Sequence, residues 1–175
     1  MHRNQIRRLT LTAMFIALGY LLPFLTGQIP QFGAMLSPMH IPALLCGFVC
    51  GWQYGLVAGA IMPLLRSATL GMPPMFPTAV AMAFELAAYG CAAGLLYRAL
   101  PKHIAFVYVT LVLSMLIGRA VWGLASAVLM MGTENVFTTQ AFLAGAFINA
   151  WPGIILHILV IPPVVLGLRR AKLMD

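Results

Sequence analysis

The sequence predicts an all-α integral membrane protein that crosses the bilayer as a bundle of six transmembrane helices, with both termini cytoplasmic. Hydrophobic residues make up 62% of the 175 positions and charged residues only 7%, whereas about 25% of a soluble domain is charged. Long apolar runs recur along the chain, and most basic residues lie at the ends of these runs. Because six spans of about 20 residues would use most of this length, residues 1–175 are predicted to form a single transmembrane domain.

Six apolar runs define the predicted spans. The basic segment before the first run is similar to a signal peptide, but no small-residue cleavage site follows, so we interpret this run as a retained helix. The second and third runs are short, and Pro38, Pro42 and Pro63 are expected to bend or interrupt them. The last three runs are longer and uninterrupted by charge clusters. In order, the spans cover about residues 9–25, 36–50, 55–66, 78–97, 105–130 and 139–168.

Basic residues mark one side of the membrane. Three Lys or Arg residues precede the first span, two separate the fourth span from the fifth, and three follow the sixth. The connections after the first, third and fifth spans contain none. With an even number of spans the basic clusters all fall on one side, which the positive-inside rule makes cytoplasmic. This placement accounts for the formal charge of +7 without a nucleic-acid site.

The sequence lacks the residues that ATP hydrolysis, metal binding and enzyme catalysis require. No G-x-x-x-x-G-K-[ST] phosphate loop occurs, so ATP hydrolysis is expected only in a partner. Cys46 and Cys50 are one turn apart with no neighbouring His or carboxylate, and together with Cys91 they are interpreted as buried thiols, so we expect no metal and no cofactor. An enzyme is disfavoured because the spans contain no carboxylate pair, and because His40 and His157 are predicted in opposite halves of the bilayer.

Three charged residues, Arg66, Glu85 and Arg119, fall inside the predicted spans. An ionised side chain at this depth costs about 2.5–3.5 kcal/mol, so each is expected to face the bundle interior and to have a partner. Glu85 and Arg119 form either a structural ion pair or part of a ligand site. Two arginines against one carboxylate leave one positive charge, which a ligand carboxylate could neutralise through two hydrogen bonds to a guanidinium. Arg66, near the outer end of its span, either contacts that ligand or extends to the interface.

Polar residues on the fourth and sixth spans extend this candidate site. Tyr89 follows Glu85 by four residues and therefore shares its helix face. Asn149 and His157 are eight residues apart, close to two helical turns, so they are expected on one inward face of the sixth span. There they serve either as hydrogen-bonding groups between helices or as ligand contacts.

Two further side chains, His40 and Trp122, are also candidates for the ligand site. His40 lies beside two prolines at the outer start of the second span, where it either lines the mouth of a site or caps a helix end. Trp122 follows Arg119 by three residues and either stacks on a flat ligand or packs within the bundle.

The first span carries Ala13 and Ala17 one helical turn apart, a small-x-x-x-small pattern that allows close helix association in lipid. This pair, six short spans with both ends inside, and external loops rich in Pro and Gly resemble the substrate-binding S components of energy-coupling factor (ECF) transporters. Residues 37–42 (SPMHIP) through 63–67 (PLLRS) are also similar to members of that family. The resemblance covers essentially the whole chain.

The resemblance implies a subunit that captures a vitamin or related micronutrient from the external side of a prokaryotic plasma membrane. It would pass this ligand inward together with a transmembrane coupling subunit, which Ala13 and Ala17 would contact, and two ATPase subunits. Ligand residues do not transfer within the family, so the candidate site rests on the charge and helix-face arguments. The unbalanced arginine favours a carboxylate such as pantothenate over a neutral vitamin such as pyridoxine. The alternative is a stand-alone ion-coupled secondary transporter in which Glu85 binds the coupling proton.

Overall fold

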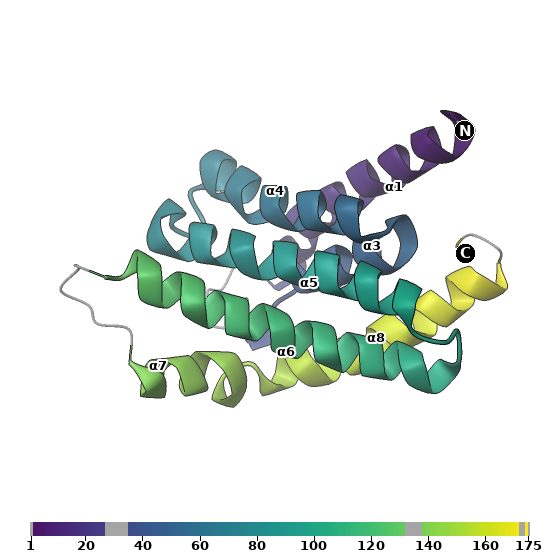
Figure 1. The fold of residues 1–175 in the computed structure, drawn as a ribbon. Helices are drawn as coiled ribbons and strands as arrows, with labels where there is room; N and C mark the ends of the chain where they lie inside the picture. The colour runs from purple at the N-terminus through teal and green to yellow at the C-terminus, as the bar shows by residue number, and fades with distance from the viewer. Residues whose placement is uncertain (1, 27–34, 132–137, 172–173, 175) are drawn as a thin grey trace.

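The computed structural model describes residues 2–26, 35–131, 138–171 and 174, and in these residues the chain is helical without strands (Figure 1). A 3₁₀ turn, Leu22–Thr26, continues the first helix, and π-helical turns at Met75–Ala79 and Ala144–Ile148 precede α5 and follow α7. Counting α7 and α8 as one interrupted stretch, the described residues form the six helical stretches that the sequence predicts. The helices are α1 (His2–Leu21), α3 (His40–Cys50), α4 (Trp52–Leu70), α5 (Val80–Ala99), α6 (Ile104–Leu129), α7 (Thr139–Leu143) and α8 (Trp151–Arg170).

Four helical stretches are long and apolar enough to cross a membrane: Asn4–Phe24, Met75–Ala99, Ile104–Leu129 and Thr139–Arg170. These four stretches confirm the prediction of an all-α membrane protein. The helix α3 has only 11 residues and is about 16 Å long, which is shorter than the hydrocarbon core of about 30 Å. Its short length places the beginning of α3 inside the bundle.

The beginning of α1 and the end of α8 lie at the same end of the bundle, on the right in Figure 1. The last residues of α3 and α5 and the first residues of α4 and α6 lie at this end too. We call it the terminal end, and the charge rule predicts that it is the cytoplasmic one. The opposite end carries the end of α4 and the start of α5 (Figure 1) and is predicted to face outward.

The helix α5 lies between α4 and α6 and contacts both of them as well as α3 (Figure 1), while α8 contacts α3 and α6. Backbones approach closely on one side of α5, because a Cβ built on Gly59 would lie 2.2 Å from the carbonyl oxygen of Leu86. A Cβ on Gly90 would lie equally close, 2.2 Å, to the carbonyl oxygen of Gly55. Gly47, Gly51, Gly55 and Gly59 recur every four residues in the sequence. All of them except Gly51 lie at the contact of α3 and α4 with α5.

Gly51 belongs to the same sequence repeat but serves a different purpose. It forms the turn between α3 and α4 with φ of 99°, a left-handed conformation that residues with a side chain rarely adopt. Apart from its chain neighbours, no atom in the described part of the chain lies within 4 Å of a Cβ built there. Backbone conformation, not close packing, therefore requires a glycine at this position.

Candidate functional site

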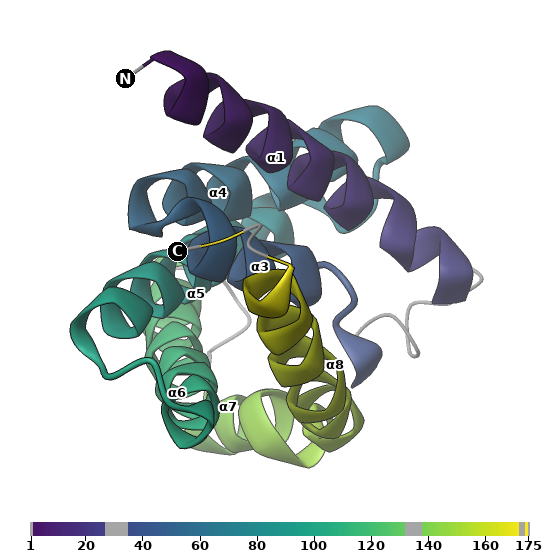
Figure 2. The ribbon, with the colours of Figure 1, turned by 90° about the vertical axis from the view of Figure 1, so that its right-hand side faces the viewer.

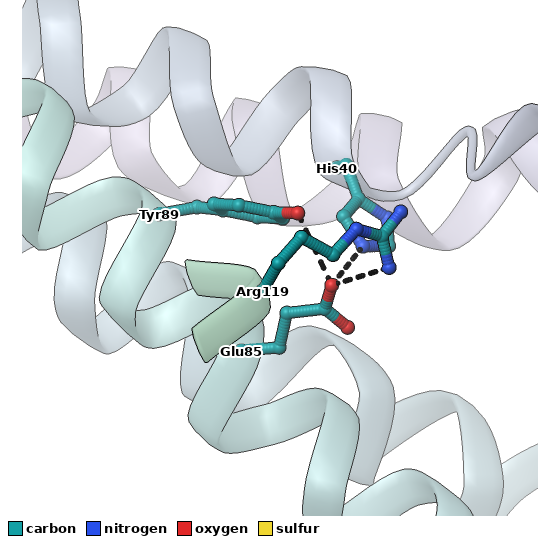
Figure 3. Close-up of polar contacts among 4 residues, drawn as sticks. All are labelled: His40, Glu85, Tyr89 and Arg119. Carbon is teal, nitrogen blue, oxygen red and sulfur yellow. Dashed lines mark hydrogen bonds and ion pairs between the residues drawn. The ribbon is translucent and has the colours of Figure 1, made fainter. Parts of the chain in front are cut away.

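Polar side chains from three helices converge on Glu85, which is 2% exposed (Figure 3). Arg119 Nη1 donates a hydrogen bond of 2.7 Å to Glu85 Oε1, and the Tyr89 hydroxyl donates one of 3.1 Å to the same oxygen. His40 Nε2 lies 3.4 Å from that oxygen as well, although without hydrogen-bond geometry. One carboxylate oxygen thus organises the three other residues of the cluster.

The sequence places these groups through helix geometry. Glu85 and Tyr89 are one turn apart on α5, and Arg119 faces them from the neighbouring helix α6. Gly118 makes room for this arrangement, because a Cβ there would lie 2.2 Å from Cδ1 of the Tyr89 ring. Gly118 was not a predicted site residue; a glycine directly before a buried arginine is the signal that could have indicated it. The predicted neighbourhood of Glu85, Tyr89 and Arg119 is present in the structure.

The two histidines inside the bundle are adjacent, with ring centroids of His40 and His157 5.9 Å apart and an interplanar angle of 30°. The prediction that they occupy opposite halves of the bilayer is therefore wrong. The physical reason is that α3 is short and begins inside the bundle, with His40 as its first residue. The separation of the histidines therefore no longer disfavours an enzyme. In the described ranges, no three His, Cys, Asp or Glu side chains come together as a metal site.

The cluster lies about midway along the bundle, because Glu85 is the eleventh of the 25 residues of Met75–Ala99 and His157 the nineteenth of the 32 residues of Thr139–Arg170. His40 begins α3, Glu85 is within the first two turns of α5, and His157 is within the first two turns of α8. All three helices run toward the terminal end (Figure 1).

Several nitrogen atoms of the cluster have no hydrogen-bond partner among the described residues. They are Arg119 Nε and both ring nitrogens of His40 and of His157. The His157 ring lies beside the backbone of Ser37, but without hydrogen-bond geometry. Burying a polar group without a hydrogen bond costs roughly 2–7 kcal/mol, and each imidazole keeps at least one N–H. The cluster therefore offers more donors than Glu85 accepts.

Arg66 lies apart from this cluster, in a contact between α4 and α1. Its Nη1 donates a 2.9 Å hydrogen bond to the carbonyl oxygen of Tyr20, and its guanidinium lies 4.9 Å from the centroid of the Phe24 ring. Cation–π contacts of this kind contribute about 0.5–2 kcal/mol. The arginine that lacks a carboxylate is thus satisfied by a carbonyl and a ring, and the two arginines do not share one site.

Trp122 and Asn149 also lie away from Glu85. Trp122 stacks on Phe142 of α7, with ring centroids 6.1 Å apart, and so packs between α6 and α7. Asn149 is exposed, whereas His157 is buried. The turn at Asn149 and Ala150 interrupts the helix between them, so the spacing of eight residues does not give a common face.

The small-residue pair of the first helix lies on the outside of the bundle. Ala13 and Ala17 are both exposed on α1, whereas Thr12 and Phe15 are buried against the neighbouring helices. Figure 2 shows α1 at the edge of the helix arrangement. A partner helix could therefore approach this face without disturbing the core.

Comparisons with known proteins identify one family. The family model described as "ECF transporter, substrate-specific component" matches residues 7–165, which is most of the chain. No curated protein and no solved structure gives a significant match.

Proposed function

The chain belongs to the family of ECF transporter substrate-specific components, and on this basis we propose that it captures a small water-soluble vitamin or related micronutrient at the outer side of a prokaryotic plasma membrane. Membership makes it a membrane subunit that binds a small-molecule substrate and associates with a coupling subunit and ATPases. In our proposal two ATPase subunits drive the coupling subunit, and ATP is hydrolysed only there. The ligand site is the cluster of His40, Glu85, Tyr89, Arg119 and His157.

The observation that carries this site is the surplus of buried hydrogen-bond donors around Glu85. Arg119 uses Nη1 for Glu85 and keeps Nε without a partner in the described part of the chain. A ligand carboxylate can accept from this Nε–H and from an imidazole N–H of His40 or His157, and hydrogen bonds to charged groups are the stronger kind. These donors support a carboxylate-bearing ligand, for which pantothenate is our candidate.

The identity of the ligand is tested by mass spectrometry of small molecules that copurify with the protein, followed by titration. We expect purified protein to bind pantothenate and to bind pyridoxine, which has no carboxylate, at least about tenfold more weakly, a difference of about 1.4 kcal/mol. The physical reason is that pyridoxine offers no anion to the donors beside Arg119. Equal affinity for both compounds, or a neutral copurifying molecule, would contradict the carboxylate assignment.

The mode of transport is tested in proteoliposomes that contain labelled ligand outside. The purified chain alone is expected to bind but not to accumulate ligand, with or without a proton or sodium gradient. Uptake is expected once the coupling subunit and ATPases are added with ATP. Accumulation by the chain alone, driven by an ion gradient and lost in Glu85→Gln, would instead establish the ion-coupled carrier.

We further propose that Ala13 and Ala17 form the contact with the coupling subunit, because both are exposed on α1. Ala13→Leu and Ala17→Leu are expected to reduce the coupling subunit recovered with the protein at least about tenfold, since a bulky side chain prevents the close backbone approach of small-x-x-x-small contacts. Ala120→Leu, at an exposed position of α6, is the matched control. Unchanged recovery for both α1 variants, or an equal loss in Ala120→Leu, would argue against this surface.

A further inference from the structure

A cavity lies at the terminal end of the bundle, and none of the residues of the Glu85 cluster lines it. The cavity has a volume of about 400 Å³ and lies between α1, the turn joining α3 to α4, and the end of α5. Three basic residues, Arg8, Arg98 and Lys102, line it, and no acidic residue is among its lining side chains in the described part of the chain. The cavity is thus positively charged.

A buried hydroxyl group also belongs to this cavity. Tyr97 lines it and is only 6% exposed, yet its hydroxyl has no hydrogen-bond partner among the residues that the structure describes. The ring is fixed by its neighbours, because the Lys102 ammonium lies 3.9 Å from its centroid and the Phe48 ring packs edge-on at 5.2 Å. A tyrosine hydroxyl without a partner can donate a hydrogen bond to an anion that reaches it.

The first turn of α4 also lines this cavity. Trp52, Gln53 and Tyr54, the first three residues of this 19-residue helix, all line the cavity. Their N–H groups precede the first possible intrahelical acceptor, and Gly51 at the N-cap has no side chain to bond them. The positive end of the helix dipole therefore points at the same cavity, as at many phosphate sites.

We propose that this cavity binds a phosphate group at the cytoplasmic surface, supplied by the headgroup of an anionic phospholipid. Arg98 and Lys102 neutralise the phosphate charge, the Tyr97 hydroxyl and the first N–H groups of α4 donate hydrogen bonds to its oxygens, and Trp52 lies at the level of the lipid headgroups. The site is separate from the substrate site around Glu85 and does not depend on the proposed function. Free inorganic phosphate has the same chemistry and is the other source to be distinguished.

The test is native mass spectrometry of the whole chain, released from detergent after incubation with phosphatidylglycerol, phosphatidylcholine or inorganic phosphate. We expect retention of phosphatidylglycerol over phosphatidylcholine, and an about fivefold loss of that retention in Arg98→Gln, the usual effect of one basic residue at an anionic headgroup. Arg170→Gln, which removes an exposed charge near the same end without touching the cavity, is the matched control and should stay near wild type. Tyr97→Phe should also weaken retention, because it removes only the hydroxyl.

The sources are separated by competition. Lipid retention that inorganic phosphate does not reduce supports the lipid headgroup, whereas displacement by inorganic phosphate together with phosphate adducts that Arg98→Gln abolishes supports a free phosphate. The proposal is overturned if phosphatidylcholine is retained equally, or if Arg98→Gln and Arg170→Gln have the same effect. None of these experiments measures substrate binding or transport, so their outcome does not depend on whether the proposed vitamin site is correct.

Discussion

Arg119→Ala is expected to weaken pantothenate binding by about 30-fold or more, whereas Arg66→Ala should leave it nearly unchanged. Removing a buried, hydrogen-bonded charge from a binding site costs at least about 2 kcal/mol of binding free energy. Arg119 is the cationic member of the Glu85 cluster, while Arg66 contacts Tyr20 and Phe24 elsewhere. Isothermal titration of pantothenate into both purified variants measures the difference.

Loss of folding must be separated from loss of the site in this experiment. Arg119→Ala leaves the Glu85 carboxylate buried without its cation, which is expected to lower the free energy of unfolding by about 3–5 kcal/mol. The double variant Arg119→Gln with Glu85→Gln removes both charges, so its thermal stability should recover toward wild type. Its pantothenate binding should nevertheless remain weak, because the guanidinium is absent.

Two results would contradict the assignment of Arg119. One is tight pantothenate binding by the charge-neutral double variant. The other is an equal and negligible effect of Arg119→Ala and Arg66→Ala in the titration. Either result would reduce the Glu85–Arg119 contact to a structural ion pair, the simpler of the two interpretations that the sequence allowed.

Gly59→Ala and Gly90→Ala are expected to destabilise the bundle by about 1–3 kcal/mol or more, the usual range for overpacking. The added methyl group at either position would lie 2.2 Å from a backbone carbonyl oxygen, of Leu86 or of Gly55 respectively. A backbone atom cannot rotate away as a side chain can, so α4 and α5 must separate. Thermal unfolding in detergent, followed by circular dichroism, measures the loss.

Gly167→Ala is the matched control, because apart from its chain neighbours and its own helix backbone no atom of the described residues lies within 4 Å of a Cβ built at this position of α8. There the same chemical change should be neutral or raise stability by about 0.4–1 kcal/mol through the unfolded chain. The sign of the effect should therefore differ between the control and the two core positions. Unchanged melting of Gly59→Ala and Gly90→Ala would show that α4 and α5 do not approach as closely as described.

The sequence by itself determined the membrane class, the six helical stretches and the family. These follow from local properties, because apolar length, basic clusters and small-residue spacing act within one helix or at its ends. It also selected Glu85, Tyr89 and Arg119 as neighbours, since a buried carboxylate in an apolar bundle requires a nearby cation.

Only the tertiary structure decided which of the other polar residues meet. The short α3 places His40 against His157, and the turn at Asn149 removes that residue from the inward face. Arg66 donates a hydrogen bond to α1 instead of joining the Glu85 cluster. Residues from α1, α4 and α5 line the basic cavity at the terminal end. The physical reason is that the position of a side chain along and around the bundle depends on where short helices begin and where a helix is interrupted. The spacing of side chains along the sequence contains neither piece of information.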